Sequence, residues 1–186
     1  MKRCVAVVLI ACLLCGCGGK SNHIEQALQL RKELLSANNC SFEATVTADY
    51  GVCLYTFQMD CSVNPEGSLS FTVKYPETIA GITGTITNDD ASLTFDNKVL
   101  SFPTLVDGQL TPVSAPWLFI NALKGGYITG YSEGEEESCI FIDDSFAENT
   151  LSLEVYCDSQ FQPQHVDFYW MRQRVLSADI RNFSIQ

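Results

Sequence analysis

The amino-acid sequence predicts an α+β fold in which an antiparallel meander of strands has helices packed on one face. Residues 22–39 and 114–126 carry apolar side chains at helical spacing, whereas the segments after each of them alternate apolar and polar residues with a period of two. Short polar turns separate the alternating runs, which is typical of antiparallel strands. We therefore expect an N-terminal helix, a central helix and one antiparallel sheet.

The N-terminal helix is predicted to begin at Asn22, which forms a capping-box pattern with Glu25 and is followed by apolar residues at helical spacing until Asn38-Asn39. Those apolar residues are Ile24, Ala27, Leu28, Leu34 and Leu35. Three strands joined by hairpins are expected next, over residues 42–48, 53–61 and 69–75. The first hairpin is predicted to turn at Tyr50-Gly51, so that the numbers of paired residues sum to 101.

A central helix is predicted where Pro116 stands near the start of an apolar segment and Gly125 stands just past its end. Further short strands are expected before it, at residues 82–87, 92–95 and 99–102, and after it, at residues 127–131, 138–143, 151–157, 166–171 and 175–185. Each strand has one apolar and one polar side, so we expect a sheet with one face in water and the other covered.

The apolar face of this sheet is long and rich in aromatic residues. Two short helices leave part of such a face uncovered, which predicts a cavity on that side. The candidate lining residues are Val46, Tyr55, Phe57, Phe71, Val73, Phe95, Trp117, Leu118, Phe168 and Trp170. Ordinary core packing is the alternative, since aromatic residues at helical and strand spacing usually belong to a core.

The first seventeen residues carry the pattern of a bacterial lipoprotein signal. Lys2 and Arg3 precede an apolar run that is too short to span a bilayer, and Leu14-Cys15-Gly16-Cys17 resembles a lipobox, whose cysteine becomes the lipid-modified first residue. We expect a signal peptide over residues 1–16, lipidated Cys17 with a short tether over residues 17–21, and a single domain over residues 22–186. A plain cleaved signal with release of the protein is the alternative.

The expected location follows from the lipid and from the charge. Two acyl chains hold a protein stably at a membrane, so we expect the domain on the outer face of a bacterial cell membrane. Removal of residues 1–16 takes away two basic residues and no acidic one, which moves the formal charge from −11 to −13. This charge disfavours nucleic acid and anionic lipid surfaces, so the anchor is expected to supply membrane residence.

The order of the elements resembles the LolA/RseB superfamily of half-barrel proteins. The resemblance rests on the central segment P-W-L-F-I-N-A-L-K-G at residues 116–125 and on the terminal pair of strands at residues 163–170 and 175–185. In that superfamily the concave face holds acyl chains or another protein, and the lipid-anchored, GerS-like germination lipoproteins of spore-forming bacteria are nearest in kind. The resemblance implies a curved sheet whose concave face is covered by the N-terminal and central helices.

These features predict a protein that acts by binding. We expect a protein partner or a scaffold role in envelope or spore physiology, and the alternative is a lipid whose acyl chains occupy the concave cavity. A tethered protein cannot carry cargo across a periplasm, so a shuttle is not expected. No cofactor is expected.

A remote alternative is an esterase. Gly130-Tyr131-Ser132-Glu133-Gly134 matches G-x-S-x-G, and Ser132, Asp143 and His165 follow the chain order of the α/β-hydrolases. That motif needs a strand, a sharp turn and a helix, whereas an acidic run and another strand-like segment follow Gly134, so no catalytic residue is expected. No metal site is expected either, because the acidic clusters lack the alternating calcium-loop pattern and the chain has only two histidines.

Five cysteines follow Cys17, namely Cys40, Cys53, Cys61, Cys139 and Cys157, and their spacing fits neither zinc nor thioredoxin-like chemistry. An extracytoplasmic location permits disulfides. The expected hairpin register sets Cys40 opposite Cys61 at a non-hydrogen-bonded site, within disulfide reach. Cys139 and Cys157 form a second candidate pair if Phe141 faces inward opposite Val155. Buried free thiols are the alternative.

Overall fold

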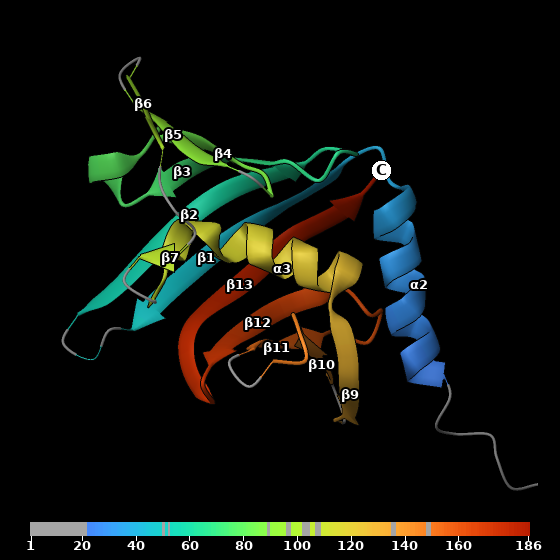
Figure 1. The fold of residues 1–186 in the computed structure, drawn as a ribbon. Helices are drawn as coiled ribbons and strands as arrows, with labels where there is room; N and C mark the ends of the chain where they lie inside the picture. The colour runs from blue at the N-terminus through green and yellow to red at the C-terminus, as the bar shows by residue number, and fades with distance from the viewer. Residues whose placement is uncertain are drawn as a thin grey trace, which may run out of the picture.

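The structure is a computed structural model that describes residues 22–49, 51, 53–88, 90–95, 98–101, 105–106, 109–134, 137–147 and 150–186. The predicted signal peptide, lipidation site and tether at residues 1–21 lie outside this part of the chain. Within it, eleven strands form one antiparallel sheet in the order β6-β5-β4-β3-β2-β1-β13-β12-β11-β10-β9. The sheet is open and curves around helix α3, with helix α2 beside it (Figure 1).

The two helices are α2 (Asn22–Ser36) and α3 (Ala115–Gly125), and short 3-10 turns are η1 (Glu77–Ile79) and η2 (Pro112–Ser114). The strands before α3 are β1 (Cys40–Asp49), β2 (Leu54–Val63), β3 (Leu69–Tyr75), β4 (Thr83–Ile86), β5 (Ala91–Phe95), β6 (Lys98–Ser101) and the small hairpin β7 (Leu105–Val106) and β8 (Gln109–Leu110). The strands after it are β9 (Tyr127–Glu133), β10 (Ser138–Asp143), β11 (Leu151–Cys157), β12 (Pro163–Trp170) and β13 (Gln173–Ile185).

The core lies between the curved sheet and α3. Along β1 and β11 every second side chain is buried, as alternation with a period of two requires. Phe119 of α3 is fully buried, and its ring centroid lies 5.8 Å from that of Phe42 in β1 and 6.2 Å from that of Phe183 in β13. These aromatic contacts hold α3 over the strands at the centre of the sheet, and we call the face they cover the inner face.

Arg31 of helix α2 bonds to the C-terminal end of α3, in addition to the apolar contacts of α2 with the core. The guanidinium of Arg31 donates to the carbonyl oxygens of Leu123 and Gly126, each at 2.7 Å. The last carbonyls of a helix have no partner within the helix, so this arginine satisfies groups that would otherwise need water. Gly126 must lack a side chain, because a Cβ there would collide with Ile142 Cγ2 of β10 and with the carbonyl oxygen of Ala122.

The register expected for the first hairpin is wrong by two residues. Cys40 pairs with Val63 and Phe42 with Cys61, so the numbers of paired residues sum to 103. The loop is longer than predicted because Asp49 pairs with Leu54 and not with Val52, and the Asp49 side chain accepts a hydrogen bond from the backbone of Gly51 at 2.8 Å. A shift of two residues keeps the same side chains on each face, which explains why the predicted apolar face is still the buried one.

Both disulfide arguments fail on this geometry, and the five described cysteines are free thiols in the structure. Cys40 and Cys61 are diagonal neighbours, and such Cα atoms lie about 7–8 Å apart, beyond disulfide reach. Cys139 pairs with Tyr156 while Cys157 pairs with Ser138, so the second pair projects from opposite faces of the sheet. Phe141 lies opposite Glu154, and not opposite Val155 as the second bridge required.

Candidate functional site

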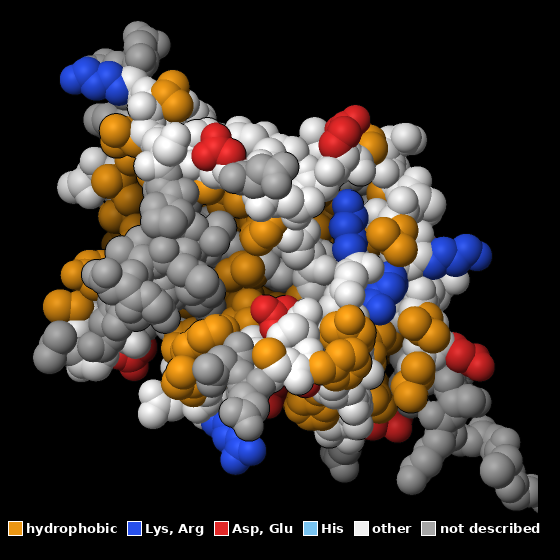
Figure 2. Space-filling view, viewed as in Figure 1, with side chains coloured by type: hydrophobic (Ala, Val, Ile, Leu, Met, Phe, Trp, Pro, Cys, Tyr) orange, Lys and Arg blue, Asp and Glu red, His pale blue; other side chains and the backbone are white. Residues whose placement is uncertain are grey.

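The predicted cavity-lining residues divide into a packed group and an open group. Val46, Phe71, Val73 and Phe168 are at most 2% exposed and belong to the core. Phe57, Trp117, Leu118 and Trp170 are half-buried and pack against that core. Tyr55 is 48% exposed, and the side chain of Phe95 lies outside the described part. Figure 2 shows hydrophobic side chains reaching the surface around α3 on this face.

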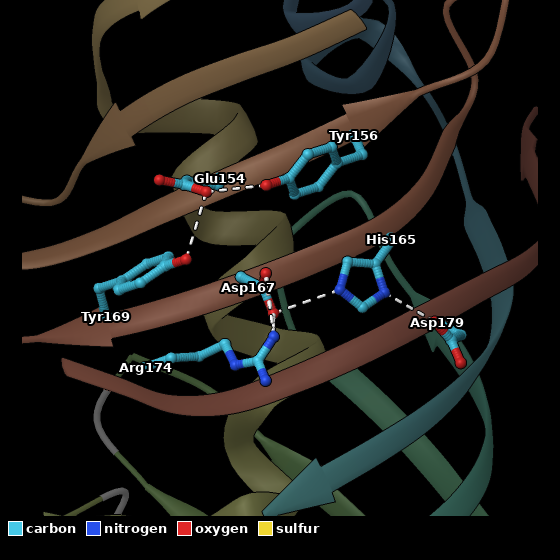
Figure 3. A network of polar contacts seen from close by, with 7 residues as sticks. All are labelled: Glu154, Tyr156, His165, Asp167, Tyr169, Arg174 and Asp179. Atoms are coloured by element: carbon cyan, nitrogen blue, oxygen red, sulfur yellow. Dashed lines mark hydrogen bonds and ion pairs between the residues drawn. The ribbon is translucent and has the colours of Figure 1, made fainter. Parts of the chain in front are cut away.

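The outer face of the same sheet carries a network of polar side chains on β11, β12 and β13 (Figure 3). His165 lies between two carboxylates, with Nδ1 at 2.7 Å from Asp179 and Nε2 at 3.2 Å from Asp167. Asp167 also accepts a hydrogen bond from Arg174 at 3.2 Å. The side chain of Asp167 is only 8% exposed, so the hydrogen bonds from His165 and Arg174 offset the loss of water around its carboxylate.

Cross-strand pairing builds this network. Tyr156 lies opposite His165, which lies opposite Asp179, and Glu154 lies opposite Asp167. Residues opposite each other on antiparallel strands have Cβ atoms about 4.5–5.5 Å apart, which is close enough for these side chains to meet. The network is therefore a consequence of the register of β11, β12 and β13.

Glu154 is the second centre of the network. One of its carboxylate oxygens accepts hydrogen bonds from Tyr156 at 2.8 Å and from Tyr169 at 3.3 Å. Burial raises the pKa of both tyrosines above the ordinary value, and the neighbouring Glu154 carboxylate raises it further. Figure 3 shows the other oxygen of Glu154 pointing away from both hydroxyl groups. Two tyrosines thus orient one carboxylate and leave its second oxygen for another partner.

A cleft of about 450 Å³ adjoins Glu154 on the outer face. The residues that line it include the aromatic Phe141 and Tyr169, the acidic Asp143 and Glu154, and Arg172 from the turn between β12 and β13. Aromatic faces beside carboxylates hold an ammonium or guanidinium group well, because the cation is attracted by both. The arginine adds a group of the opposite sign, so the cleft matches a surface that carries both charges.

The residues of the remote esterase alternative do not come together. Ser132 lies in strand β9, and two strands separate it from His165 in β12. The pairing across them runs from Ser132 to Cys139 in β10, from Cys139 to Tyr156 in β11, and from Tyr156 to His165. Three strand spacings separate Ser132 from His165, about 14 Å. Both ring nitrogens of His165 contact carboxylates. Among the residues that the structure describes, no group of three or more potential ligands is placed to hold a metal ion.

Sequence reasoning considered His165 only in the esterase alternative and missed the network around it. The signal was present in the polar positions of β11 and β12, where residues 152, 154 and 156 and residues 165, 167 and 169 alternate with apolar ones. Without the register, these positions show only that they share the outer face. The pairing of one strand with the next decides which of them meet.

Comparison with known proteins gives likenesses in fold alone. No family model and no curated protein matches the sequence. A DUF1329 family protein from Desulfovibrio piger has a TM-score of 0.49 at 9% identity and covers 87% of this chain and 91% of its own. A LolA superfamily protein from Nitrosomonas europaea has a TM-score of 0.47 at 8% identity, with coverages of 87% and 93%. The Mycobacterium tuberculosis lipoprotein LppX has a TM-score of 0.40 at 13% identity, with coverages of 87% and 91%.

A protein of the LolA superfamily is thus among the solved structures that this chain resembles. At these identities and scores the likeness carries no statement about ligand or partner. The narrower resemblance to germination lipoproteins stays a prediction.

Proposed function

We propose that this chain is an extracytoplasmic lipoprotein, anchored through Cys17, that acts by binding a protein partner and not by catalysis. The lipobox-like sequence supports the anchor, and no helix in the described part of the chain is long and apolar enough to cross a membrane. The observation that carries the proposal is Glu154, which is oriented by two tyrosines at the edge of a cleft with aromatic walls. A basic side chain of the partner occupies this cleft.

The anchor is tested by replacing the lipidated residue. The thioether to diacylglycerol forms only at the lipobox cysteine, so Cys17→Ala should abolish labelling with radioactive palmitate and leave the precursor uncleaved. Labelling and cleavage are followed in cells by gel electrophoresis. Unchanged labelling of the variant would remove the anchor from the proposal.

Partner binding is tested at the rim of the cleft. A photoreactive amino acid in place of exposed Arg172 should crosslink to a protein in intact cells, and Glu154→Gln in the same chain should strongly reduce that crosslink because the charge is lost. Asp60→Asn is the matched control. Asp60 of β2 forms an ion pair with Lys74 of β3, and three strands separate β2 from β11, which carries Glu154. Crosslinks that Glu154→Gln leaves unchanged would contradict the proposal.

Acyl-chain binding at the open end of the inner face is the second candidate. Tyr55 favours it, because this residue lies opposite Ala48 on the inner face and is still 48% exposed. Native mass spectrometry of the protein without its anchor should then show bound lipid that Tyr55→Ser removes. Tyr75→Ser is the control, since Tyr75 is equally exposed at 49% but lies opposite Gln58. Absence of lipid from the unaltered protein would exclude this candidate.

A further inference from the structure

Helix α2 carries two apolar surfaces, of which α3 and the core cover one. Ala27, Leu30 and Leu34 are at most 5% exposed. Ile24, Leu28 and Leu35 are 48%, 49% and 63% exposed. We call these last three residues the α2 stripe, and Figure 2 shows hydrophobic side chains at the surface along this helix.

The members of the α2 stripe lie along one side of the helix. At about 100° per residue, its three members fall within an arc of about 40°. The centre of that arc lies about 110° around the helix from the centre of the buried residues. The stripe therefore faces sideways, away from α3, and is not an extension of the core contact.

One of the two basic residues that border the stripe is already engaged within the fold. Arg31 lies at the border between the stripe and the buried side, and its guanidinium donates to the carbonyl oxygens at the end of α3. Lys32, on the other border, is exposed. A lysine in that position can lay its aliphatic stem along an apolar surface and extend its ammonium group to phosphate.

The short chain before α2 identifies what covers the stripe. From Cys17 to Asn22 the chain has five steps, which span at most about 18 Å when fully extended. A lipid on Cys17 would therefore hold the first turn of α2, with Ile24, close to the headgroups. An apolar helix side beside a basic residue is the pattern of a helix that lies in the membrane interface.

We propose that the α2 stripe docks onto the outer surface of the membrane and fixes the orientation of the domain there. The proposal rests on the lipid anchor of the proposed function. Because the mature chain is strongly acidic, the contact is apolar in the main, and it needs the anchor to keep the helix at the surface.

The test places an environment-sensitive fluorophore on α2 in the full lipidated protein. Leu28→Cys and Leu35→Cys report on the stripe, and Glu33→Cys, about 160° from its centre, is the matched control. All three carry Cys53→Ser to remove the exposed native thiol. The remaining thiols are buried, and burial raises the pKa of Cys40 to about 11 and that of Cys139 and Cys157 to about 12, which keeps them poorly reactive.

The proteins are reconstituted into phosphatidylcholine–phosphatidylglycerol vesicles with and without spin-labelled lipid. We expect blue-shifted emission and quenching by the spin label at positions 28 and 35, and neither at position 33. Equal, unquenched emission at all three positions would overturn the docking. A blue shift without quenching would also overturn it, because a second copy or a protein partner would then cover the stripe.

Flotation of the same vesicles separates this inference from the anchor. If the unaltered protein floats with the vesicles and position 28 is unquenched, only the docking fails. If it does not float, the anchor fails and the docking with it.

Discussion

The two faces of the sheet between β10 and β13 share the same strands but are stabilised in different ways. On the inner face, Phe168 and Leu153 are at most 1% exposed and pack under α3 with the rest of the core. On the outer face, at the adjacent position of each strand, Asp167 and Glu154 are held by hydrogen bonds and ion pairs. The inner face is stabilised by close packing of buried side chains, and the outer face by polar contacts between side chains. Substitutions on the two faces should therefore cost different amounts of stability.

The largest effect is expected at the centre of the inner face. Phe119→Ala removes the ring that contacts Phe42 and Phe183, and the cavity it leaves should cost about 3–5 kcal/mol of unfolding free energy. Urea denaturation of the domain measures this loss. A cost below about 1 kcal/mol would mean that α3 is not held by this aromatic cluster.

A smaller loss is expected where α3 meets β10. Gly126→Ala places a methyl group against Ile142 and a backbone carbonyl oxygen, and overpacking of this kind costs about 1–3 kcal/mol. Gly125→Ala is the control, since a Cβ at that position meets nothing within 4 Å. Thermal unfolding of both variants should show a lower midpoint for the first alone.

The outer face should tolerate truncation better. Asp167→Ala removes the shared partner of His165 and Arg174, but both of these are partly exposed and regain water, so we expect a loss of about 1 kcal/mol. Asp60→Ala breaks an ion pair whose side chains are 57% and 52% exposed, and this should cost less still. Equal losses for the two variants would show that the network adds nothing beyond a surface ion pair.

The smallest effect near neutral pH comes from the buried thiols. Burial raises the pKa of Cys40 to about 11 and that of Cys157 to about 12, whereas a cysteine in the unfolded chain has a pKa of about 8.5. The unfolded state therefore loses protons first, so stability should be constant up to about pH 8 and fall as pH rises above it. Denaturation under reducing conditions measures this slope. An alkaline slope that appears only after reduction would show that the thiols are oxidised in the purified protein.

The period of two in the sequence was enough to predict the strands and their buried sides, because burial depends on local alternation. It was not enough to predict the first hairpin, whose loop is set by the side chain of Asp49 and a residue with positive φ, Gly51. The network of His165 depends on strand pairing, which alternation leaves open. The α2 stripe was visible in part, because Ile24, Leu28 and Leu35 were predicted as apolar positions, but the sequence cannot divide them from the residues that α3 covers.

The contact of Arg31 with the end of α3 also gives the molecule a mechanical connection. A force applied to the chain at Cys17 acts first on α2. The hydrogen bonds of Arg31 transmit this force to Leu123 and Gly126, which lie directly before the start of β9. Force from the membrane would thus reach the edge of the sheet through Arg31, beside the apolar contacts that Ala27, Leu30 and Leu34 make with the core. Arg31→Met keeps much of the side-chain bulk and removes these hydrogen bonds, so it should let α2 detach at lower load while the sheet stays folded.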